Sequence, residues 1–404
     1  MKSVLEGIRV LEWAAYHVGP HAASILGDLG ADVIKIEEKE RGDPFRGYKR
    51  IMGIPAVSPE GVNLLFENHN RSKRAISIDL KKTRGREVVY RLVGNADVFL
   101  TNFRVEPANR LGMDYETLKQ HNKELIYAGA SGFGPQGPDC FSPAFDMVGQ
   151  ARAGIMLAQK SSEEEPFSIT GLGDQMGAIT TAFGVLAALI GRERLGIGQQ
   201  VNSSLLGSMM WLQATNVAFS LSTGQELTRR ERKKAVSALL NVYQASDEKW
   251  ICLGMGPLAD RYWPSLCRAL DMQELENDPR FDCLENKEKN SEELVAILDN
   301  VFAQRPREEW LRVLKHWDLV ASPVNTISDL PDDTQVQEND YIIDYDHPVL
   351  GKVKELGFPV RLTETPARVS SCAPAHGQHT EEVLLDIAGY SWNEIGELKD
   401  EGVI

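Results

Sequence analysis

The sequence predicts an α/β fold, with a parallel sheet in a Rossmann-like large domain and a smaller α+β domain. Residues 8–13 and 31–37 are short apolar runs typical of buried strands, and residues 22–29 between them repeat apolar side chains at helical spacing. A strand, a helix and a strand in this order form a βαβ unit, whose strands lie parallel in one sheet. After about residue 225 the pattern changes character, which indicates the second domain.

The alternation continues beyond the first βαβ unit. Apolar runs at 75–80, 96–100 and 125–130 predict further strands, and periodic segments at 83–94 and 114–120 predict the helices between them. The loops after these strands carry Gly, Asn and Arg. Because ligands of open α/β sheets bind outside the carboxyl ends of the strands, we expect these loops to face a ligand.

This placement singles out Asn102, Phe103, Arg104 and the loop at 131–137. A dinucleotide site, with Glu37 on a ribose hydroxyl, would need a glycine fingerprint after the first strand. No GxGxxG stands there, so the scaffold is expected to hold a different ligand.

The 404 residues are too many for one ordinary core, and two domains are expected. The change of character places a smaller domain at about 225–325, after a large-domain segment at 1–224. A charged link at 229–234 is expected to be solvated surface. Within the smaller domain the sequence predicts a hairpin at 242–253 and helices near 259–271, 291–303 and 307–316.

Composition excludes several classes of partner. A net charge of −14 argues against nucleic acid or an anionic membrane as the main partner, since both need broad positive potential. The five cysteines are scattered without a CxxC pair, as in a reduced, cytoplasmic protein. No leader and no apolar run of membrane-spanning length is expected. The eight histidines lack HxH or HExxH spacing, so no metal site is expected, and a GxSxG elbow is absent.

Two acids stand where helices are predicted to begin. Asp174 follows a Gly-Leu-Gly turn and precedes the uncharged stretch 176–190, and Asp146 follows Phe145 at the start of another helical pattern. Each acid has two interpretations, a helix cap or a site carboxylate, and the local sequence favours the cap. A carboxylate at a helix start is expected to be stabilised as the anion. That state suits a nucleophile, which would form a mixed anhydride on attacking an acyl group, but not a general acid.

Several motifs stand in a characteristic order along the chain. They are Gly7–Glu12 (GIRVLE), Val18–Pro20 (VGP), Leu29–Glu37 (LGADVIKIE), Asn70–Ile76 (NRSKRAI), Ala96–Arg104 (ADVFLTNFR), Arg110–Met113 (RLGM), Ser131–Gly134 (SGFG), Gly171–Asp174 (GLGD) and Gly377–Leu384 (GQHTEEVL). Over nearly its whole length the chain closely resembles the class III CoA-transferase (CaiB/BaiF) family.

The resemblance implies transfer of coenzyme A from an acyl-CoA donor to a carboxylic acid acceptor. The family's nucleophile falls on Asp174. Its contacts with coenzyme A, the only cofactor implied, fall on His17, Val18, Lys73, Asn102, Phe103 and Arg110. His17, Phe145 and Asp146 are expected to bind the acyl groups. The resemblance also implies an interlocked homodimer whose large domain combines 1–224 with a returning segment at 326–404.

Departures from the family pattern bear on the substrate. His17 stands where oxalate-type members carry Gln, and Glu38 stands where many carry Arg, which shifts a phosphate contact to Lys39 or Arg41. The glycine-run loop of formyl-CoA transferases has no counterpart at 235–240. The acceptor is therefore expected to be a larger acid of aryl, 2-hydroxy or branched type.

Two alternatives stay open. An α-methylacyl-CoA racemase needs two bases, and its histidine falls on Phe145, which cannot accept a proton. A CoA-binding protein without catalysis is the second alternative, against which the intact turn at Asp174 argues. The cations at 71–74 are a candidate phosphate site, although a solvated basic loop is the favoured interpretation from local sequence.

Overall fold

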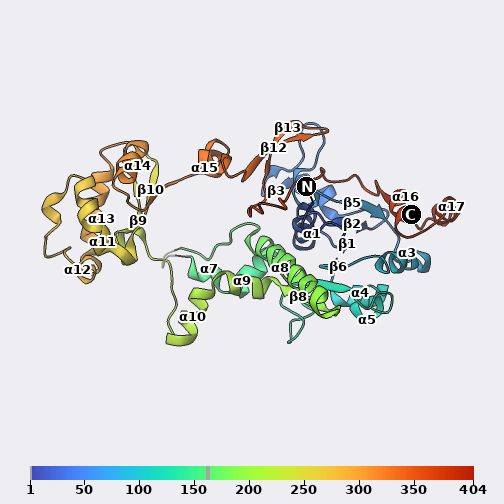
Figure 1. Cartoon of the computed structure of the whole chain (residues 1–404). Helices are drawn as coiled ribbons and strands as arrows, with labels where there is room; N and C mark the ends of the chain where they lie inside the picture. The colour runs from blue at the N-terminus through green and yellow to red at the C-terminus, as the bar shows by residue number, and fades with distance from the viewer. Residues whose placement is uncertain (1, 161–163) are drawn as a thin grey trace. The chain divides into compact units, whose positions relative to one another are not determined.

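A computed structural model describes residues 2–160 and 164–404 of the chain. The chain folds into two compact units, each described here by itself (Figure 1). Unit 1 comprises residues 1–157, 167–227 and 338–404, and unit 2 comprises residues 158–166 and 228–337. The C-terminal segment thus packs into the same unit as the N-terminus.

Unit 1 is built on a six-stranded parallel sheet in the order β5-β2-β1-β6-β7-β8. The strands of unit 1 are β1 (Arg9–Trp13), β2 (Asp32–Glu37), β5 (Arg74–Ser77), β6 (Val98–Thr101), β7 (Ile126–Ser131) and β8 (Gln200–Ser204), with the antiparallel pairs β3 (Arg50–Ile51) with β4 (Ile54–Pro55) and β12 (Ile342–His347) with β13 (Gly351–Leu356). The parallel α/β fold predicted from the sequence is confirmed.

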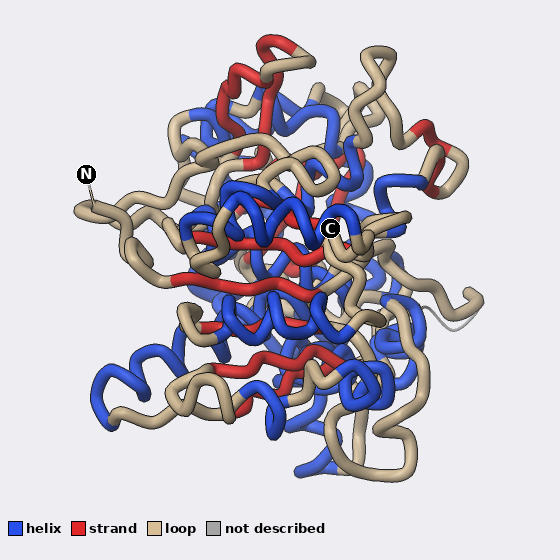
Figure 2. The backbone as a smooth tube through the Cα atoms, turned by 90° about the vertical axis from the view of Figure 1, so that its right-hand side faces the viewer, coloured by secondary structure: helices blue, strands red, loops and turns tan. Residues whose placement is uncertain are grey.

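Helices of unit 1 cover the sheet, as Figure 2 shows with helices in blue over strands in red. They are α1 (Val18–Asp28), α2 (Leu64–Asn70), α3 (Thr83–Val93), α4 (Val105–Leu111), α5 (Tyr115–Leu118), α6 (Asp146–Arg152), α8 (Leu172–Leu195), α9 (Leu205–Leu212), α10 (Ala214–Thr223), α16 (Thr380–Asp386) and α17 (Trp392–Asp400), while α7 (Ile155–Ala158) lies at the unit boundary.

The alternation of side chains along β6 shows how the two faces are filled. Val98 and Leu100 pack into the core under α1 and α8, whereas Phe99 packs into the core under α3, α16 and α17. Neighbouring strand residues point to opposite faces, so a strand buried on both sides is apolar throughout. Val383 and Leu398 of the C-terminal helices lie in the same core as Phe99. The returning C-terminal segment therefore completes the core on that face of the sheet.

Unit 2 is a smaller α+β unit with its own core. Its antiparallel sheet has the order β11-β10-β9, and Trp263, Phe302 and Trp310 are buried in the core. Its elements are β9 (Leu240–Gln244), β10 (Trp250–Gly254), α11 (Ala259–Ala269), α12 (Leu284–Lys289), α13 (Ser291–Phe302), α14 (Arg307–His316), β11 (Ala321–Val324) and α15 (Thr334–Gln337). The predicted hairpin and the three predicted helices are present.

Two expectations about helices are wrong. The apolar stretch 205–221, whose composition predicts one buried helix, forms two helices, α9 and α10, which break at Gln213. Leu205 and Met209 are buried, but Trp211 is 74% exposed and Leu221 83%. Helix α8 is long and apolar enough to span a membrane, by length and composition alone, although the sequence was not expected to contain such a run. The core helix of a globular protein passes the same test, and Ala178, Val185 and other side chains of α8 pack into the core.

Candidate active site

The Asp146 carboxylate organises the turn that carries Asp174. Its Oδ2 accepts the backbone N–H of Gly171 at 2.8 Å, and its Oδ1 accepts those of Gly173 at 2.7 Å and Asp174 at 3.2 Å. Asp146 therefore caps α8 from the start of α6, a role that local sequence favoured for Asp174. A Cβ on Gly173 would lie 3.0 Å from Oδ1 of Asp146, so this close approach needs glycine.

Gln150, one turn further along α6, locks this arrangement. Its Nε2 donates to Asp146 Oδ1 at 2.9 Å and to the carbonyl of Ile169 at 2.7 Å, while its Oε1 accepts the Ile169 N–H at 3.0 Å. The side chain is almost fully buried. The turn is thus fixed at both ends before α8 begins.

Asp174 is the third residue of α8, and its side chain lines a cavity. Burial, and then the negative charge of Asp146, raise the pKa of Asp174 from 3.8 to about 7. The expectation of a carboxylate strongly stabilised as the anion is therefore wrong. The reason is that the N–H groups at the helix start already donate to Asp146, so they are not free to stabilise a second charge.

His17 lies directly beside Asp174. Its Nδ1 is 3.5 Å from Oδ2 of Asp174, and its Nε2 is 2.8 Å from Oε1 of Gln175. Burial lowers the pKa of His17, against the opposing effects of Gln175 and Asp146. His17 is therefore a neutral imidazole within reach of the Asp174 carboxyl.

The loop before His17 is strained and clamped. Tyr16 has a φ of 66°, a left-handed conformation that is uncommon for a bulky residue. Its N–H donates to Asp43 Oδ1 at 3.2 Å, and Asn102 exchanges two hydrogen bonds with the backbone of Ala15, at 2.7 and 3.0 Å. These bonds hold His17 in place from two directions.

The cavity around Asp174 has a volume of about 330 Å³. It brings together six residues that the sequence analysis assigned to the site, namely His17, Val18, Asn102, Phe103, Phe145 and Asp174. Arg104 also lines it. Asp146 does not line this cavity, because it lies behind the turn and bonds to the backbone.

A second cavity, of about 640 Å³, is lined by Ala15, Tyr16 and Phe103, which also line the first. Arg41 and Lys81 are its cationic lining residues. The sequence analysis named Arg41 as a phosphate contact but missed Lys81. The position of Lys81 shortly after the carboxyl end of β5 could have predicted its place in the cavity, because ligands of an open α/β sheet bind at that end of the strands.

Lys73 does not reach either cavity. Its ammonium is fully buried, 2.7 Å from Glu12 Oε2, and it donates to the carbonyls of Pro20 and His69 and to Asn70 Oδ1 at 2.7, 2.9 and 3.0 Å. Burial lowers its pKa to about 8. Lys73 is therefore a residue of the buried core, and it lines neither cavity near Asp174.

The other cations of segment 71–74 are also paired with acids, Arg71 in the core and Arg74 at a partly exposed site. Arg71 pairs with Asp28 at 2.7 Å and Arg74 with Asp32 at 2.7 Å. Arg110 is exposed at the end of α4 and lines neither cavity near Asp174. The segment is therefore neither the phosphate site nor the solvated loop that its sequence suggested.

Glu37 is held by Arg46, whose guanidinium donates to both of its carboxylate oxygens at 2.8 and 2.7 Å. Both carboxylate oxygens of Glu37 therefore already accept from a guanidinium, and neither is the unpaired acceptor that a ribose hydroxyl would need. This agrees with the absence of a glycine fingerprint for a dinucleotide.

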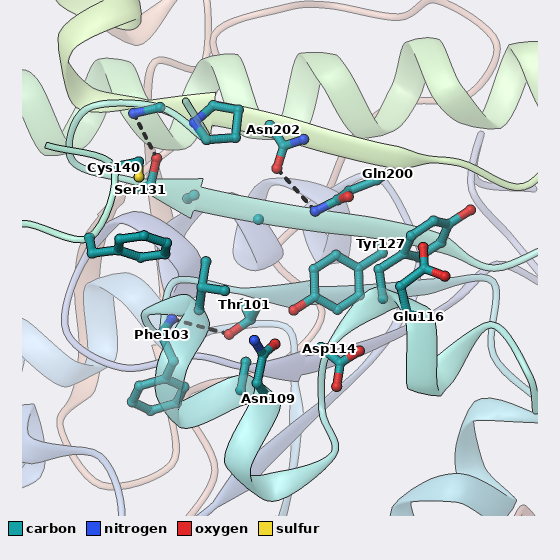
Figure 3. A pocket seen from close by; sticks show the side chains of 18 residues that line it. Thr101, Phe103, Asn109, Asp114, Glu116, Tyr127, Ser131, Cys140, Gln200 and Asn202 are labelled. Carbon is teal, nitrogen blue, oxygen red and sulfur yellow. Dashed lines mark hydrogen bonds between the residues drawn. The ribbon is translucent and has the colours of Figure 1, made fainter. Parts of the chain in front are cut away.

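A third cavity, of about 340 Å³, lies along β6, β7 and β8 (Figure 3). Thr101, Tyr127 and Asn202 point into it from the sheet, and Asp114 lies at its margin (Figure 3). Asp114 is used as the cap of α5, accepting the Thr117 N–H at 3.0 Å. This cavity shares Phe103 and Cys140 with the cavity around Asp174.

Glu67, His347 and Cys372 form a group close enough to hold a metal ion, the one such group among the described residues. Nδ1 of His347 accepts the N–H groups of Val349 and Leu350, both at 3.1 Å. A neutral imidazole then carries its proton on Nε2, which faces Glu67 at 3.6 Å. At that distance Nε2 makes no hydrogen bond, so Nδ1, which accepts two backbone N–H groups, is the engaged nitrogen of the ring.

Comparisons with known proteins agree with this architecture. Residues 5–380 match the model of CoA-transferase family III. The chain is 30% identical over 405 residues to a (R)-2-hydroxy-4-methylpentanoate CoA-transferase of Clostridioides difficile, covering 99% of each, and 32% identical over 366 residues to an acetyl-CoA:oxalate CoA-transferase of Acetobacter aceti, covering 90% of each. A crystal structure of a CaiB/BaiF family protein from Brucella suis superposes with a TM-score of 0.82 at 29% identity, over 96% of this chain and 100% of that one. The chain therefore belongs to CoA-transferase family III and is an enzyme of that family.

Proposed function

We propose that Asp174 is the nucleophile of a CoA-transferase that moves coenzyme A from an acyl-CoA donor to a carboxylic acid. One observation carries the proposal: the Asp174 carboxyl lines a cavity while Asp146 takes over the capping of its helix. A side chain that need not cap its own helix is free to attack a substrate. The raised pKa of Asp174 also makes the carboxylate a stronger nucleophile than an ordinary one.

The reaction runs in two symmetric halves. An Asp174 oxygen attacks the donor thioester, the C–S bond breaks, and CoA thiolate leaves an aspartyl–acyl anhydride. The thiolate then attacks the aspartyl carbonyl, which releases the donor acid and leaves an aspartyl-CoA thioester. The acceptor carboxylate attacks this thioester, and the same steps in reverse yield the new acyl-CoA and regenerate Asp174.

The backbone N–H groups of Gly173 and Gln175, which flank Asp174 and are candidate oxyanion donors by position, are occupied. Gly173 donates to Asp146 at 2.7 Å, and Gln175 donates to the carbonyl of Gly171 at 2.8 Å. His17 is the polar side chain nearest the attacking carboxyl, so we assign it the acyl-facing role that the sequence suggested.

We place the pantetheine arm and thioester of coenzyme A in the cavity around Asp174, against Val18, Asn102 and Phe103. The phosphorylated nucleotide part extends into the adjoining cavity, where Arg41 and Lys81 are the cations available to its phosphates. Five carboxylates line the same cavity, those of Glu37, Glu38, Glu40, Asp43 and Asp79. This assignment replaces Lys73 by Lys81.

Apolar groups dominate the wall near Asp174, where Val18, Ala144, Phe145 and Leu205 line the cavity. Such a wall favours a branched or aryl acid, with His17 as a partner for a 2-hydroxyl group. One relative is named for a branched 2-hydroxy acid, and another for oxalate at similar identity, so the relatives' names do not decide the acceptor. A screen of acids against several acyl-CoA donors, read by mass spectrometry, identifies it.

Racemase chemistry fits the site poorly. Two bases of a racemase flank one α-carbon, and His17 and Asp174 are only 3.5 Å apart, which leaves no room for a carbon between them. Phe145, at the position of the racemase histidine, lines the cavity without a proton acceptor. Hydrogen exchange at the α-carbon without an acceptor acid would revive this alternative.

We also propose that two copies of the chain associate in the cytoplasm. Helices α8 and α9 expose large apolar side chains, including Phe183 at 72% and Trp211 at 74%. A second copy is the expected cover for such a surface in this family. Light scattering is expected to give twice the chain mass, and a monomer would contradict the assembly without bearing on Asp174.

Trapping the acylated enzyme tests the nucleophile. Incubation with acyl-CoA and hydroxylamine is expected to convert Asp174 to a hydroxamate, seen in its peptide by mass spectrometry. Asp174→Ala is expected to abolish both the hydroxamate and CoA transfer. Asp400→Ala, which removes an exposed acid at the end of α17, is the matched control and should behave as wild type. Full transfer by Asp174→Ala would overturn the proposal.

A further inference from the structure

Behind Asp174 lies a cluster of four polar side chains from three helices, which we call the histidine cluster: His17 at the start of α1, His21 in α1, His69 in α2 and Gln175 in α8. The ring centres of His17 and His69 are 4.0 Å apart, and those of His21 and His69 are 5.5 Å apart. No established step of CoA transfer requires three adjacent histidines.

Gln175 joins the two histidines of α1. Its Oε1 is 2.8 Å from Nε2 of His17, and its Nε2 is 2.9 Å from Nε2 of His21. An amide oxygen only accepts and an amide nitrogen only donates. His17 therefore carries a proton on Nε2, and His21 accepts on Nε2 and carries its own proton on Nδ1.

All three histidines are held neutral. Burial, together with the neighbouring His17 and the charges of Lys73 and Arg71, lowers the pKa of His21 to about 3. Burial and the neighbouring histidines lower the pKa of His69 to about 2. His69 donates from Nδ1 to the carbonyl of Leu65 at 2.6 Å, which leaves a lone pair on its Nε2.

The tautomer of His17 determines its contact with Asp174. A neutral imidazole has a single N–H, so a proton on Nε2 leaves a lone pair on Nδ1. That nitrogen is 3.5 Å from Oδ2 of Asp174. Two lone pairs facing each other repel, so the contact is attractive only when one proton lies between the two atoms. The Asp174 carboxyl, which is half protonated near pH 7, supplies that proton.

The charges around this pair come from all sides. Asp146 of α6 faces Asp174 through the turn, and its negative charge favours the protonated carboxyl. Lys73 and Arg71 act on the far side of the cluster, through His21. Gln175 is the neutral group that directly contacts the ring of His17 away from Asp174.

We propose that His17 is the base for Asp174 and that Gln175 and His21 are positioning residues that hold His17 in the tautomer able to accept its proton. This inference rests on the proposed role of Asp174 as nucleophile. As the carboxyl attacks the thioester, the O–H bond of Asp174 breaks and an N–H bond forms on Nδ1 of His17. The imidazolium then donates from Nε2 to Gln175, and its charge lies beside the departing CoA thiolate. When Asp174 is regenerated, the proton returns to it.

Two substitutions of Gln175 test the inference because they act in opposite directions. Gln175→Leu removes the acceptor that stabilises the imidazolium. Its rate of Asp174 acylation is expected to fall on the order of tenfold at pH 7 and to recover at higher pH, where Asp174 ionises without a base. Gln175→Glu places a negative charge beside His17, stabilises the imidazolium and is expected to keep acylation active to lower pH than in wild type.

Controls separate this inference from folding and from the proposed function. His121→Phe, which changes a histidine stacked on Tyr90 outside the cluster, is expected to keep the wild-type pH profile. Wild-type profiles in both Gln175 variants would overturn the inference while leaving the hydroxamate at Asp174 intact. If a variant does not fold, ¹⁵N spectra of histidine-labelled wild type decide: a proton on Nδ1 of neutral His17, with none on Nε2, would contradict the proposed tautomer.

Discussion

The carboxylate of Asp146 caps the helix that carries Asp174: its Oδ1 accepts the backbone N–H groups of Gly173 at 2.7 Å and of Asp174 itself at 3.2 Å. One acid thus does the structural work of the turn while the other faces the cavity. Burial, and then the nearby negative charge of Asp146, raise the pKa of Asp174. Capping and reactivity, which the sequence presents as alternatives for one residue, are divided between two.

Asp146→Asn separates these two effects. The amide oxygen can still accept the N–H groups of Gly173 and Asp174, while the amide NH2 cannot accept the N–H of Gly171, so we expect a loss of stability of about 1 kcal/mol. Loss of the negative charge lowers the pKa of Asp174, so the acid side of the pH profile for Asp174 acylation is expected to move to lower pH. Asp146→Ala removes the cap as well and is expected to cost about 2 kcal/mol. An unchanged pH profile in Asp146→Asn would show that the two carboxyls are not coupled.

Asp174→Asn is expected to stabilise the protein at neutral and higher pH. The pKa of Asp174 is raised from 3.8 to about 7 in the folded state, so the folded chain binds this proton more tightly than the unfolded chain. Its contribution to stability is therefore greatest below about pH 4 and is lost as pH rises towards 7. The shift corresponds to at most about 4 kcal/mol. Urea unfolding at pH 5 and pH 8 should show a larger gain for the variant at pH 8, and an equal gain at both would contradict the raised pKa.

Lys81→Ala is expected to weaken binding of coenzyme A without affecting the chemistry. Lys81 lines the cavity that we assign to the phosphorylated part of coenzyme A, so its loss should raise KM for acyl-CoA about tenfold at low ionic strength. A pantetheine thioester without those phosphates supplies the control, because wild type and variant should use it equally well. A change in kcat with an unchanged KM would argue against this placement.

Lys73→Met is expected to act on stability instead. The ammonium of Lys73 pairs with buried Glu12, which also accepts from Lys35 at 2.7 Å. Glu12 keeps Lys35, but Lys35, Glu12 and Asp43 are then left with one excess buried negative charge, which is expected to cost about 3–5 kcal/mol. Lys81→Met makes the same substitution at an exposed lysine. It is the matched control and should unfold like wild type. Equal stability of the two variants would show that Lys73 is not part of the core.

Much of this architecture follows from local sequence. The mostly apolar runs at 8–13 and 31–37 with the helical repeat between them predict the first βαβ unit correctly, because strands covered on both faces are mostly apolar, and the buried Glu12 and Lys35 within them pair with each other. The Gly-Leu-Gly-Asp turn predicts the position of Asp174 at a helix start. These features depend on neighbours within a few residues.

The assignments that sequence reasoning missed depend on contacts between distant segments. Local sequence cannot show that Asp146 reaches the turn at Asp174, since the two residues lie 28 positions apart in the sequence. In the local sequence, Lys73 and Lys81 are both lysines close to the same strand, β5. Only the structure distinguishes them, because it places the buried Glu12 beside Lys73 and puts Lys81 in the lining of a cavity. From the sequence, His21 and His69 are ordinary helix residues. Only the packing of α1 against α8 shows that His21 contacts Gln175.

Oxygen transfer tests the central claim most directly. In the proposed reaction the acceptor carboxylate attacks the aspartyl-CoA thioester, and one of its oxygens stays on Asp174 when the new acyl-CoA leaves. Turnover with an acceptor labelled with ¹⁸O in its carboxylate is therefore expected to place one ¹⁸O in the peptide that contains Asp174, and later in the acid released from the next donor. Continued turnover with no label in that peptide would contradict the role of Asp174 as the nucleophile.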